Sequence, residues 1–326
     1  MEKITINGVK SSYDVILEKA ILNNKITFLD DYQKVCLLLD KNVDCSLYNE
    51  LLKQIREKKN IIIFTNGSEK TKSFSFYQKV LRQLIENNFN RNDAIVALGG
   101  GTTLDLAGFV CSSYKRGINL VSIPSSLLAM VDASIGSKNS INYLDNKNII
   151  GSFYDPKLVI IDQDLLNSLP KKQFYSGLCE VLKMALLANK ELFEKIEKNN
   201  FRIEELIHQS ILIKKHFVEK DIYDISYRHG LNLGHSYGHA IESISNFKIA
   251  HGIAVANGLL YILDEPLKSR VQKILKKWRI KMVSYSKEQL NPYLLNDKKN
   301  ENKSINFVYL KEIGCFIING KEYYYG

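Results

Sequence analysis

Two histidines four residues apart lie in the segment LNLGHSYGHAIES (231–243), in a chain that has six histidines altogether. On a helix, residues i and i+4 lie one above the other, so His235 and His239 could act on one ligand together. Such a pair suits a metal ion, and it equally suits two histidines that hydrogen-bond to neighbouring backbone. The spacing by itself leaves both interpretations open.

A glutamate and a third histidine could complete a metal site. Glu180 lies among apolar residues in GLCEVLKM (177–184), where a carboxylate is costly without a partner, and His251 begins HGIAVANGLL (251–260). Two histidines and one glutamate from three helices would leave coordination positions open, as catalytic zinc requires. The alternative for Glu180 is an ion pair with Lys183, three residues further on. The other histidines are expected to be exposed or to cap helices: His208, His216 and His229.

Three glycines in AIVALGGGTTLDLAGFV (94–110) join an apolar strand to a helix that begins near Thr102. Glycines let the backbone approach a ligand closely, and the N-terminus of a helix attracts anions. A pyrophosphate would fit there. The G-x-G-x-x-G pattern is absent, however, and three glycines can also form a plain tight turn.

A second polar group follows the strand and turn NLVSIPSSLLAM (119–130). Its small and polar residues indicate irregular backbone beside a ligand, with a solvated loop as the alternative. Lysine and asparagine side chains at such a loop could hold phosphate or carboxylate groups. The candidates are Asp132, Lys138, Lys147 and Asn148.

The elements that must position these residues alternate between short apolar runs and helical patterns. The predicted strands are 34–40, 60–64, 94–98, 119–123 and 158–162. Near-continuous apolar strands between helices indicate a parallel sheet covered on both faces. After Pro170 the pattern becomes helical. We therefore expect a Rossmann-like nucleotide-binding α/β domain at 1–170 and an all-α, or mostly helical, metal- and substrate-binding domain at 171–326.

Composition narrows the class of protein further. The chain has 326 residues and a formal net charge of +10, but its lysines alternate with glutamates, as in KELFEKIEKN (190–199). We expect a small anionic substrate to account for this basicity, and no nucleic-acid partner. Five scattered cysteines indicate reduced thiols in a cytosol. We find neither a signal peptide nor an apolar run that could span a membrane, and therefore expect a cytoplasmic protein with no membrane contact.

Four segments, in this order and spacing, resemble the 3-dehydroquinate synthase family of sugar-phosphate cyclases: IPSSLLAMVDASIGSK (123–138), DNKNIIGSFYDPK (145–157), SGLCEVLKMA (176–185) and LNLGHSYGHAIES (231–243). The resemblance implies a lyase that converts 3-deoxy-D-arabino-heptulosonate 7-phosphate into 3-dehydroquinate and phosphate. It implies NAD and zinc or cobalt as cofactors. It also implies a homodimer, in which Arg116 reaches the phosphate bound by the neighbouring subunit.

The resemblance also assigns roles to individual residues. It implies three metal ligands: Glu180, His235 and His251. It implies five catalytic residues: Asp132, Lys138, Asn148, Lys183 and His239. Besides Arg116, it implies five residues that bind substrate: Lys214, Arg228, Asn232, Lys298 and Lys299. The positions that match NAD-binding residues are Asp40, Asn42, Glu69, Lys72, Gly100, Gly101, Asp105, Ser125, Ser126, Lys138, Lys147 and Ser168.

Several residues depart from the family pattern. Leu104 follows the glycines where a smaller residue is usual, so it is expected to narrow the approach to the pyrophosphate. Ser137 replaces a glycine before Lys138, which affects the flexibility expected of that loop. Asp224 replaces a glutamate. Ile253 also stands where the family has a glutamate, so a partner of the metal site is expected to be missing.

Three alternatives to a 3-dehydroquinate synthase stay open at this point. A related cyclase would act on a heptulose phosphate without the carboxylate, which Arg228 and Asn232 argue against. An iron-type NAD-dependent alcohol dehydrogenase would have aspartate and three histidines at its metal, which Glu180 argues against. A non-catalytic paralogue would explain Ile253.

Overall fold

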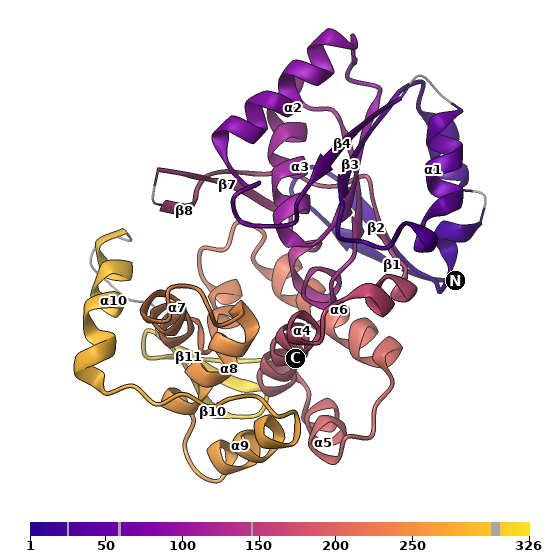
Figure 1. Cartoon of the computed structure of the whole chain (residues 1–326). Coiled ribbons are helices and arrows are strands. Elements are labelled where there is room, and N and C mark those ends of the chain that lie inside the picture. Colours follow the sequence, from indigo (N-terminus) through magenta and orange to yellow (C-terminus); the bar gives the residue numbers. More distant parts are fainter. Residues whose placement is uncertain (25, 58–59, 145, 301–306) are drawn as a thin grey trace. The chain divides into compact units, whose positions relative to one another are not determined.

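Figure 1 shows the chain in a computed structural model that describes residues 1–24, 26–57, 60–144, 146–300 and 307–326, with side chains described up to 294 in the last helix. The chain divides into two compact units, Met1–Leu169 and Pro170–Gly326. Within the described residues, no helix is both long enough and apolar enough to cross a membrane.

The first unit is built on a seven-stranded sheet with the strand order β1-β2-β9-β6-β5-β3-β4. The strands β1 (Glu2–Asn7) and β2 (Ser12–Leu17) pair antiparallel, and the other pairs in the sheet are parallel. The parallel strands are β3 (Val35–Asp40), β4 (Ile61–Thr65), β5 (Ala94–Gly99), β6 (Asn119–Pro124) and β9 (Leu158–Ile161). β3 and β5 are buried at every position, which explains their continuous apolar sequences. The predicted parallel α/β architecture is confirmed.

Three helices accompany this sheet: α1 (Asn49–Arg56), α2 (Phe74–Glu86) and α3 (Gly101–Ser113). α3 contacts β5, β6 and a separate two-stranded hairpin formed by β7 (Lys138–Tyr143) and β8 (Asn146–Phe153). Buried Leu106, Ala107 and Val110 of α3 join Ile141 of β7 in one core. Figure 1 shows the hairpin extending from one side of the unit. The packing of Ile141 against α3 holds the hairpin in place.

The second unit is mostly helical, as expected. Its α-helices are α4 (Lys171–Ala188), α5 (Lys190–Lys198), α6 (Ile203–Lys220), α7 (His235–Ile244), α8 (His251–Ile262), α9 (Leu267–Lys277) and α10 (Lys287–Asn300). α8 packs against α4 and α7. α4 is buried from Ser176 to Leu187, which places Glu180 and Lys183 in the interior of the unit.

The prediction of an all-α second domain needs one correction. The chain ends in a three-stranded antiparallel sheet of β10 (Val308–Glu312), β11 (Cys315–Ile318) and β12 (Lys321–Tyr324). Aromatic rings attach this sheet to α6, because Phe217 lies 5.6 Å from Phe316 between ring centroids. His216 joins the cluster, 4.6 Å from the Tyr325 ring, so the expectation that it is exposed or caps a helix is wrong.

Candidate functional site

Three candidate metal ligands come together in the second unit. Glu180 lies within α4, whereas His235 and His251 are the first residues of α7 and α8. Their ligand atoms all lie within 4.8 Å of one another. Oε1 of Glu180 is 3.9 Å from Nε2 of His235 and 3.6 Å from Nε2 of His251. Residues that are distant in the sequence therefore offer one oxygen and two nitrogens to a common point.

Both histidine rings are oriented through their Nδ1 atoms. Nδ1 of His235 lies 3.3 Å from the carbonyl oxygen of Leu233, and Nδ1 of His251 lies 3.1 Å from Oε2 of Glu242. These acceptors favour a proton on Nδ1, which leaves Nε2 free to bind a metal ion. Burial, followed by the charge of Lys183, lowers the pKa of His235 well below its ordinary value. His235 is therefore neutral, the form that coordinates metals.

The Glu180 carboxylate is fully buried and only partly compensated. Nζ of Lys183 lies 2.6 Å from Oε2 in an ion pair, so the alternative seen in the sequence is also present. Apart from this ion pair, neither carboxylate oxygen of Glu180 has a hydrogen-bond partner. A buried carboxylate oxygen without a donor is destabilising. A cation beside Oε1 would remove that cost.

The geometry of the three residues fits a zinc or cobalt ion. Tetrahedral zinc with bonds of about 2.0–2.2 Å separates its ligand atoms by about 3.3–3.6 Å. The separation of 3.6 Å from Oε1 to Nε2 of His251 lies at the upper end of this range, and that of 3.9 Å to Nε2 of His235 is slightly larger. Three protein ligands of this type also leave open coordination positions, as a catalytic metal site requires.

His239 lies one turn after His235 on α7, as the four-residue spacing predicts. Its ring centroid is 5.6 Å from that of His235 and 5.8 Å from that of His251. Its side chain is exposed. Together with Glu242 and His251, it forms a second group whose ligand atoms lie within 4.8 Å of one another.

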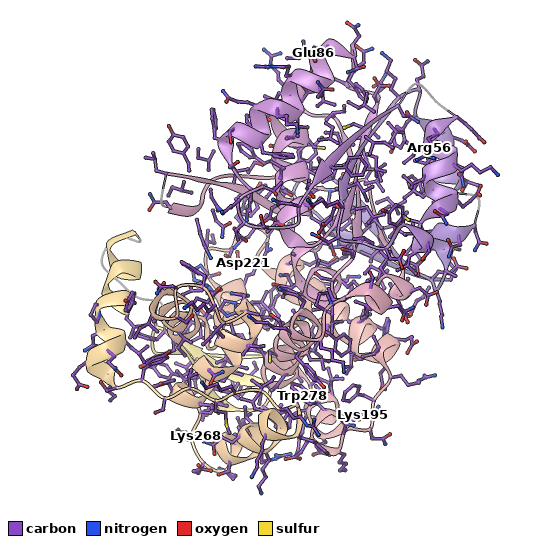
Figure 2. All side chains as sticks on the ribbon, in the orientation of Figure 1. Arg56, Glu86, Lys195, Asp221, Lys268 and Trp278 are labelled. Carbon is purple, nitrogen blue, oxygen red and sulfur yellow. The ribbon has the colours of Figure 1, made fainter. Side chains whose placement is uncertain are left out.

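The turn before α7 carries further predicted substrate-binding residues in the 3-10 helix η7 (Tyr227–Asn232). Arg228 is 3% exposed and its Nη1 donates to the carbonyl oxygen of Ile222 at 2.9 Å, whereas Asn232 is exposed. The Asp221 carboxylate, labelled in Figure 2, accepts hydrogen bonds from the backbone N–H groups of Ile225, Ser226 and Arg228. These three bonds fix the turn that positions Arg228. Lys214, on the neighbouring helix α6, is 7% exposed.

In the first unit, the glycine turn is open on one side. A Cβ atom on Gly99 would lie 2.7 Å from Cβ of Thr103, whereas one on Gly100 would meet only Oγ of Ser126, at 3.7 Å. Oγ1 of Thr102, in the first turn of α3, is buried without a hydrogen-bond partner. The space beside Gly100 therefore lets an anion approach the N–H groups at the N-terminus of α3.

Leu104 does not restrict this turn. Its side chain is 3% exposed and belongs to the core cluster that lies against α3. The expectation that Leu104 narrows the approach to a pyrophosphate is therefore wrong, because the larger side chain adds to the core.

A buried lysine links several of the predicted NAD positions in the first unit. Nζ of Lys72 contacts the side chains of both Asp105 and Asn148. Asn142 extends this network, since its Nδ2 donates to Glu69 at 2.8 Å and its Oδ1 accepts from the backbone of Asn148 at 2.9 Å. Burial raises the pKa of Asp105 even though Lys72 opposes the rise. The network joins the hairpin β7–β8 to α3.

Other predicted cofactor positions lie at the ends of β3 and β6, the two strands that flank β5. Beyond β3, Asn42 donates from its backbone and its side chain to Oδ1 of Asp40, at 3.0 and 2.9 Å. Beyond β6, Ser125 donates from its backbone to Gly99, and Oγ of Ser126 accepts from the backbone of Ala129. Carboxyl ends of adjacent parallel strands form the usual ligand-binding edge of such a sheet.

The remaining candidates of the first unit lie at several other places in its fold. Asp132 lies in the π-helical turn Ala129–Ala133, exposed Lys138 begins β7, and Lys147 is exposed on β8. Gly101 begins α3, and the Ser168 hydroxyl donates to Leu165 at the end of a 3-10 helix, Gln163–Ser168. Arg116 is exposed in a turn with left-handed backbone. The side chains of Lys298 and Lys299 lie outside the described residues.

Sequence reasoning missed two side chains that orient candidate residues. Glu242 contacts His251, and Asp155 accepts a hydrogen bond from Oγ of Ser137 at 2.5 Å, directly before Lys138. Glu242 lies within the quoted segment LNLGHSYGHAIES, three residues after His239, so a carboxylate on the histidine face of the helix was a visible signal.

The parallel-sheet unit with its glycine turn and the helical unit with its Glu–His–His group define a dehydroquinate-synthase-like fold. Residues 62–176 match the profile of the 3-dehydroquinate synthase N-terminal family, and residues 177–300 match the 3-dehydroquinate synthase C-terminal family. This chain belongs to the 3-dehydroquinate synthase family.

Individual relatives agree with this assignment. The 3-dehydroquinate synthase of Pelagibacter ubique is 36% identical, covering 96% of this chain and 93% of its own length. That of Clostridium perfringens is 38% identical, covering 96% of both chains. Among solved structures, 2-deoxy-scyllo-inosose synthase complexed with carbaglucose-6-phosphate, NAD+ and Co2+ superposes with a TM-score of 0.85 at 25% identity, covering 100% of this chain and 95% of that one.

Proposed function

We propose that this chain catalyses the reaction of its family, in which 3-deoxy-D-arabino-heptulosonate 7-phosphate loses phosphate and closes to 3-dehydroquinate. Such an enzyme is a lyase that uses NAD and a divalent metal ion, zinc or cobalt. The observation that supports this most directly is the buried Glu180 carboxylate, whose Oε1 faces two histidine nitrogens and accepts no hydrogen bond. The family relationship supplies the substrate and the reaction.

Glu180, His235 and His251 would hold the metal ion. Lys183 holds Oε2 of Glu180, so that Oε1 faces the histidines. When bound, NAD would supply reversible hydride transfer, and the metal ion would supply Lewis acidity. The buried surroundings of Glu180 would keep bulk water from the ligands, which strengthens their interaction with a cation.

The substrate carries a phosphate and a carboxylate, so cationic and amide side chains have to orient both groups. Lys138, Asn148 and His239 would hold the phosphate and the carbon that loses its proton. Lys214, Arg228 and Asn232 would hold the carboxylate and hydroxyl groups, and Asp132, Lys298 and Lys299 would complete the site. The departing phosphate can itself take up the proton, so these residues act chiefly by positioning.

NAD would lie along the edge of the parallel sheet. Its pyrophosphate would lie at the N-terminus of α3, beside Gly100, Gly101 and Ser126. Asp40, the last residue of β3, and Asn42, just after it, would accept hydrogen bonds from hydroxyl groups of the cofactor. Lys72, Glu69 and Asp105 would support the hairpin that carries Lys138 and Lys147.

A homodimer in the cytosol accompanies this proposal. All five cysteines are free, as a reducing compartment requires. Light scattering of the purified protein tests the dimer, and a monomeric active species would contradict it.

The test of the proposed function is phosphate release. Metal-free protein receives the heptulosonate phosphate with NAD, with zinc or cobalt, or with both. We expect release only with both, and 3-dehydroquinate as the product. A carboxylate-free heptulose phosphate serves as the second substrate, and preference for it would indicate a related cyclase. Failure with both substrates, despite bound NAD and metal, would contradict the proposal and leave a non-catalytic paralogue.

A further inference from the structure

The contact between Glu242 and His251 joins two closely packed helices. Glu242 lies near the end of α7, and His251 begins α8. Oε2 of Glu242 lies 3.1 Å from Nδ1 of His251, while Nε2 of the same ring lies 3.6 Å from Oε1 of Glu180. Glu242 is 8% exposed, whereas the His251 side chain is 33% exposed.

Glycines fix the register of the two helices. A Cβ atom on Gly238 of α7 would lie 2.9 Å from Cα of Val255, and one on Gly258 of α8 would lie 2.2 Å from the carbonyl oxygen of Gly234. Backbones that approach this closely have little freedom to slide. The position of Glu242 relative to the His251 ring is therefore set by the packing of α7 on α8.

Ile253, two residues after His251 on α8, is not placed to hold the His251 ring. Residues two apart on a helix point in directions about 200° apart, and they do not face each other. A glutamate at 253 could therefore not reach Nδ1 of His251. The partner that holds the His251 ring is Glu242, on the neighbouring helix. That Ile253 removes another partner of the metal site stays a prediction.

We propose that Glu242 is a positioning residue for the metal site. It holds the His251 ring with its Nδ1 proton towards the carboxylate, which directs Nε2 to the metal ion and raises metal affinity. Carboxylates that orient metal-bound histidines in this way typically contribute about 10–100-fold to metal affinity. The inference rests on the proposed function, because it takes Glu180, His235 and His251 as the metal ligands.

A different use of Glu242 is a second ion bound by His239, Glu242 and His251, whose ligand atoms also lie within 4.8 Å of one another. His251 would then have to give up its Nδ1 proton to coordinate through that atom. The hydrogen-bond distance of 3.1 Å to Glu242 and the exposure of His239 favour the orienting role. The number of ions bound per chain separates the two uses.

The experiment measures metal binding directly. Zinc and cobalt affinities of metal-free wild type, Glu242→Gln and Glu242→Ala are determined by competition with a chromophoric chelator, together with the cobalt absorption spectrum. We expect Glu242→Ala to bind about 100-fold and Glu242→Gln about 10-fold more weakly, since the amide oxygen still accepts the Nδ1 proton but carries no charge. Glu205→Gln, which removes a carboxylate paired with Lys195 on the surface of the same unit, is the control. Its affinity should equal that of wild type.

Each contrary result has a separate meaning. Wild-type affinity and spectrum in Glu242→Ala, or in Glu242→Gln if the alanine variant does not fold, would overturn the inference. If wild type binds two ions and the Glu242 variants lose only the second, the inference would also be overturned, because Glu242 would then be a ligand of the His239–Glu242–His251 group. Recovery of affinity in Glu242→Ala/Ile253→Glu would overturn the geometric argument. If wild type binds no metal, the proposed function fails first.

Discussion

The ammonium nitrogen of Lys183 lies 2.6 Å from Oε2 of Glu180, one turn earlier on α4, and both side chains are buried. Removing the lysine would leave a buried carboxylate without a compensating charge. We expect Lys183→Met to destabilise the metal-free protein by about 3–5 kcal/mol. Saturating zinc should recover part of this loss, because a cation at Oε1 compensates the same charge. Denaturant unfolding with and without zinc measures both effects.

The matched control is Lys195→Met. Lys195, labelled in Figure 2, forms ion pairs at the surface with exposed Glu191 and half-buried Glu205. Surface pairs contribute little to stability, so this variant should unfold close to wild type, with or without zinc. A similar loss of stability in both variants would mean that leaving the buried Glu180 carboxylate without Lys183 costs no more than breaking a surface ion pair.

Ser137 explains how this chain tolerates a side chain where a glycine is expected. Its φ is +63°, in the left-handed region, and its hydroxyl donates to Oδ1 of Asp155 at 2.5 Å. Ser137→Ala should destabilise the protein by about 1–2 kcal/mol, because it keeps the strained backbone and loses the hydrogen bond. Ser137→Gly also loses the bond but relieves the strain, so it should stay within about 1 kcal/mol of wild type. Thermal unfolding compares wild type, Ser137→Ala and Ser137→Gly. If Ser137→Ala is at least as stable as Ser137→Gly, this explanation is contradicted.

The central strands could be predicted because burial on both faces gives an unmistakable apolar run. The predicted strands 34–40, 94–98 and 119–123 correspond to β3, β5 and β6 within one or two residues. β1 and β2 were missed, because their alternating burial gives a weaker pattern. β10, β11 and β12 were missed as well, because they follow a helical region and the sequence indicates no sheet that such short strands could join.

The sequence predicted which residues form the site but not which side chains orient them. Motifs singled out Glu180, His235 and His251, and the fold brings their ligand atoms together. Which residue orients His251 depends on the packing of α7 on α8, and that is invisible in a linear pattern. In the same way, the backbone conformation at Ser137 decides what its hydroxyl can contact. The departures from the family were therefore easier to find than to interpret.

His216 should make folding stability sensitive to acid. Burial, together with the charge of Lys220, lowers the pKa of His216. The unfolded chain takes up this proton near about pH 6.5, but the folded chain does so only at lower pH. Because the unfolded state then binds more protons, stability falls as the pH drops below that value.

His216→Phe keeps an aromatic ring in the cluster and removes the titrating group. We expect it to lose less stability than wild type when metal-free protein is moved from about pH 7.5 to about pH 5. Urea unfolding at each pH measures the difference. His208→Gln, on the same helix but outside the cluster, should behave like wild type. Equal acid losses in all three proteins would show that His216 does not contribute.

His235→Ala should abolish metal binding while the fold persists. The ring supplies one of three ligand atoms, and its loss should weaken zinc affinity beyond the about 10–100-fold typical of an outer partner. Metal analysis after dialysis measures the binding, and circular dichroism with cooperative unfolding reports the fold. Wild-type metal content would contradict the assignment, and so would full activity in a metal-free sample.

Arg116 lies in an exposed turn where φ is positive at three successive residues, Lys115, Arg116 and Gly117. If its guanidinium reaches the phosphate in the neighbouring subunit, Arg116→Ala should raise the KM for substrate about tenfold or more, because a charge-assisted hydrogen bond is lost. Stability should hardly change at an exposed side chain. Steady-state kinetics and thermal unfolding check both expectations.

Mixed dimers test whether Arg116 acts across the subunit boundary. One chain carries Arg116→Ala and its partner carries His235→Ala, and the two are refolded together. The first chain keeps its metal ligands and receives an intact arginine from the second, so one site per mixed dimer should regain wild-type kinetics. Activity above the sum of the two separate proteins supports action in trans. Activity equal to that sum, in a sample shown to contain mixed dimers, would mean that each Arg116 serves its own subunit.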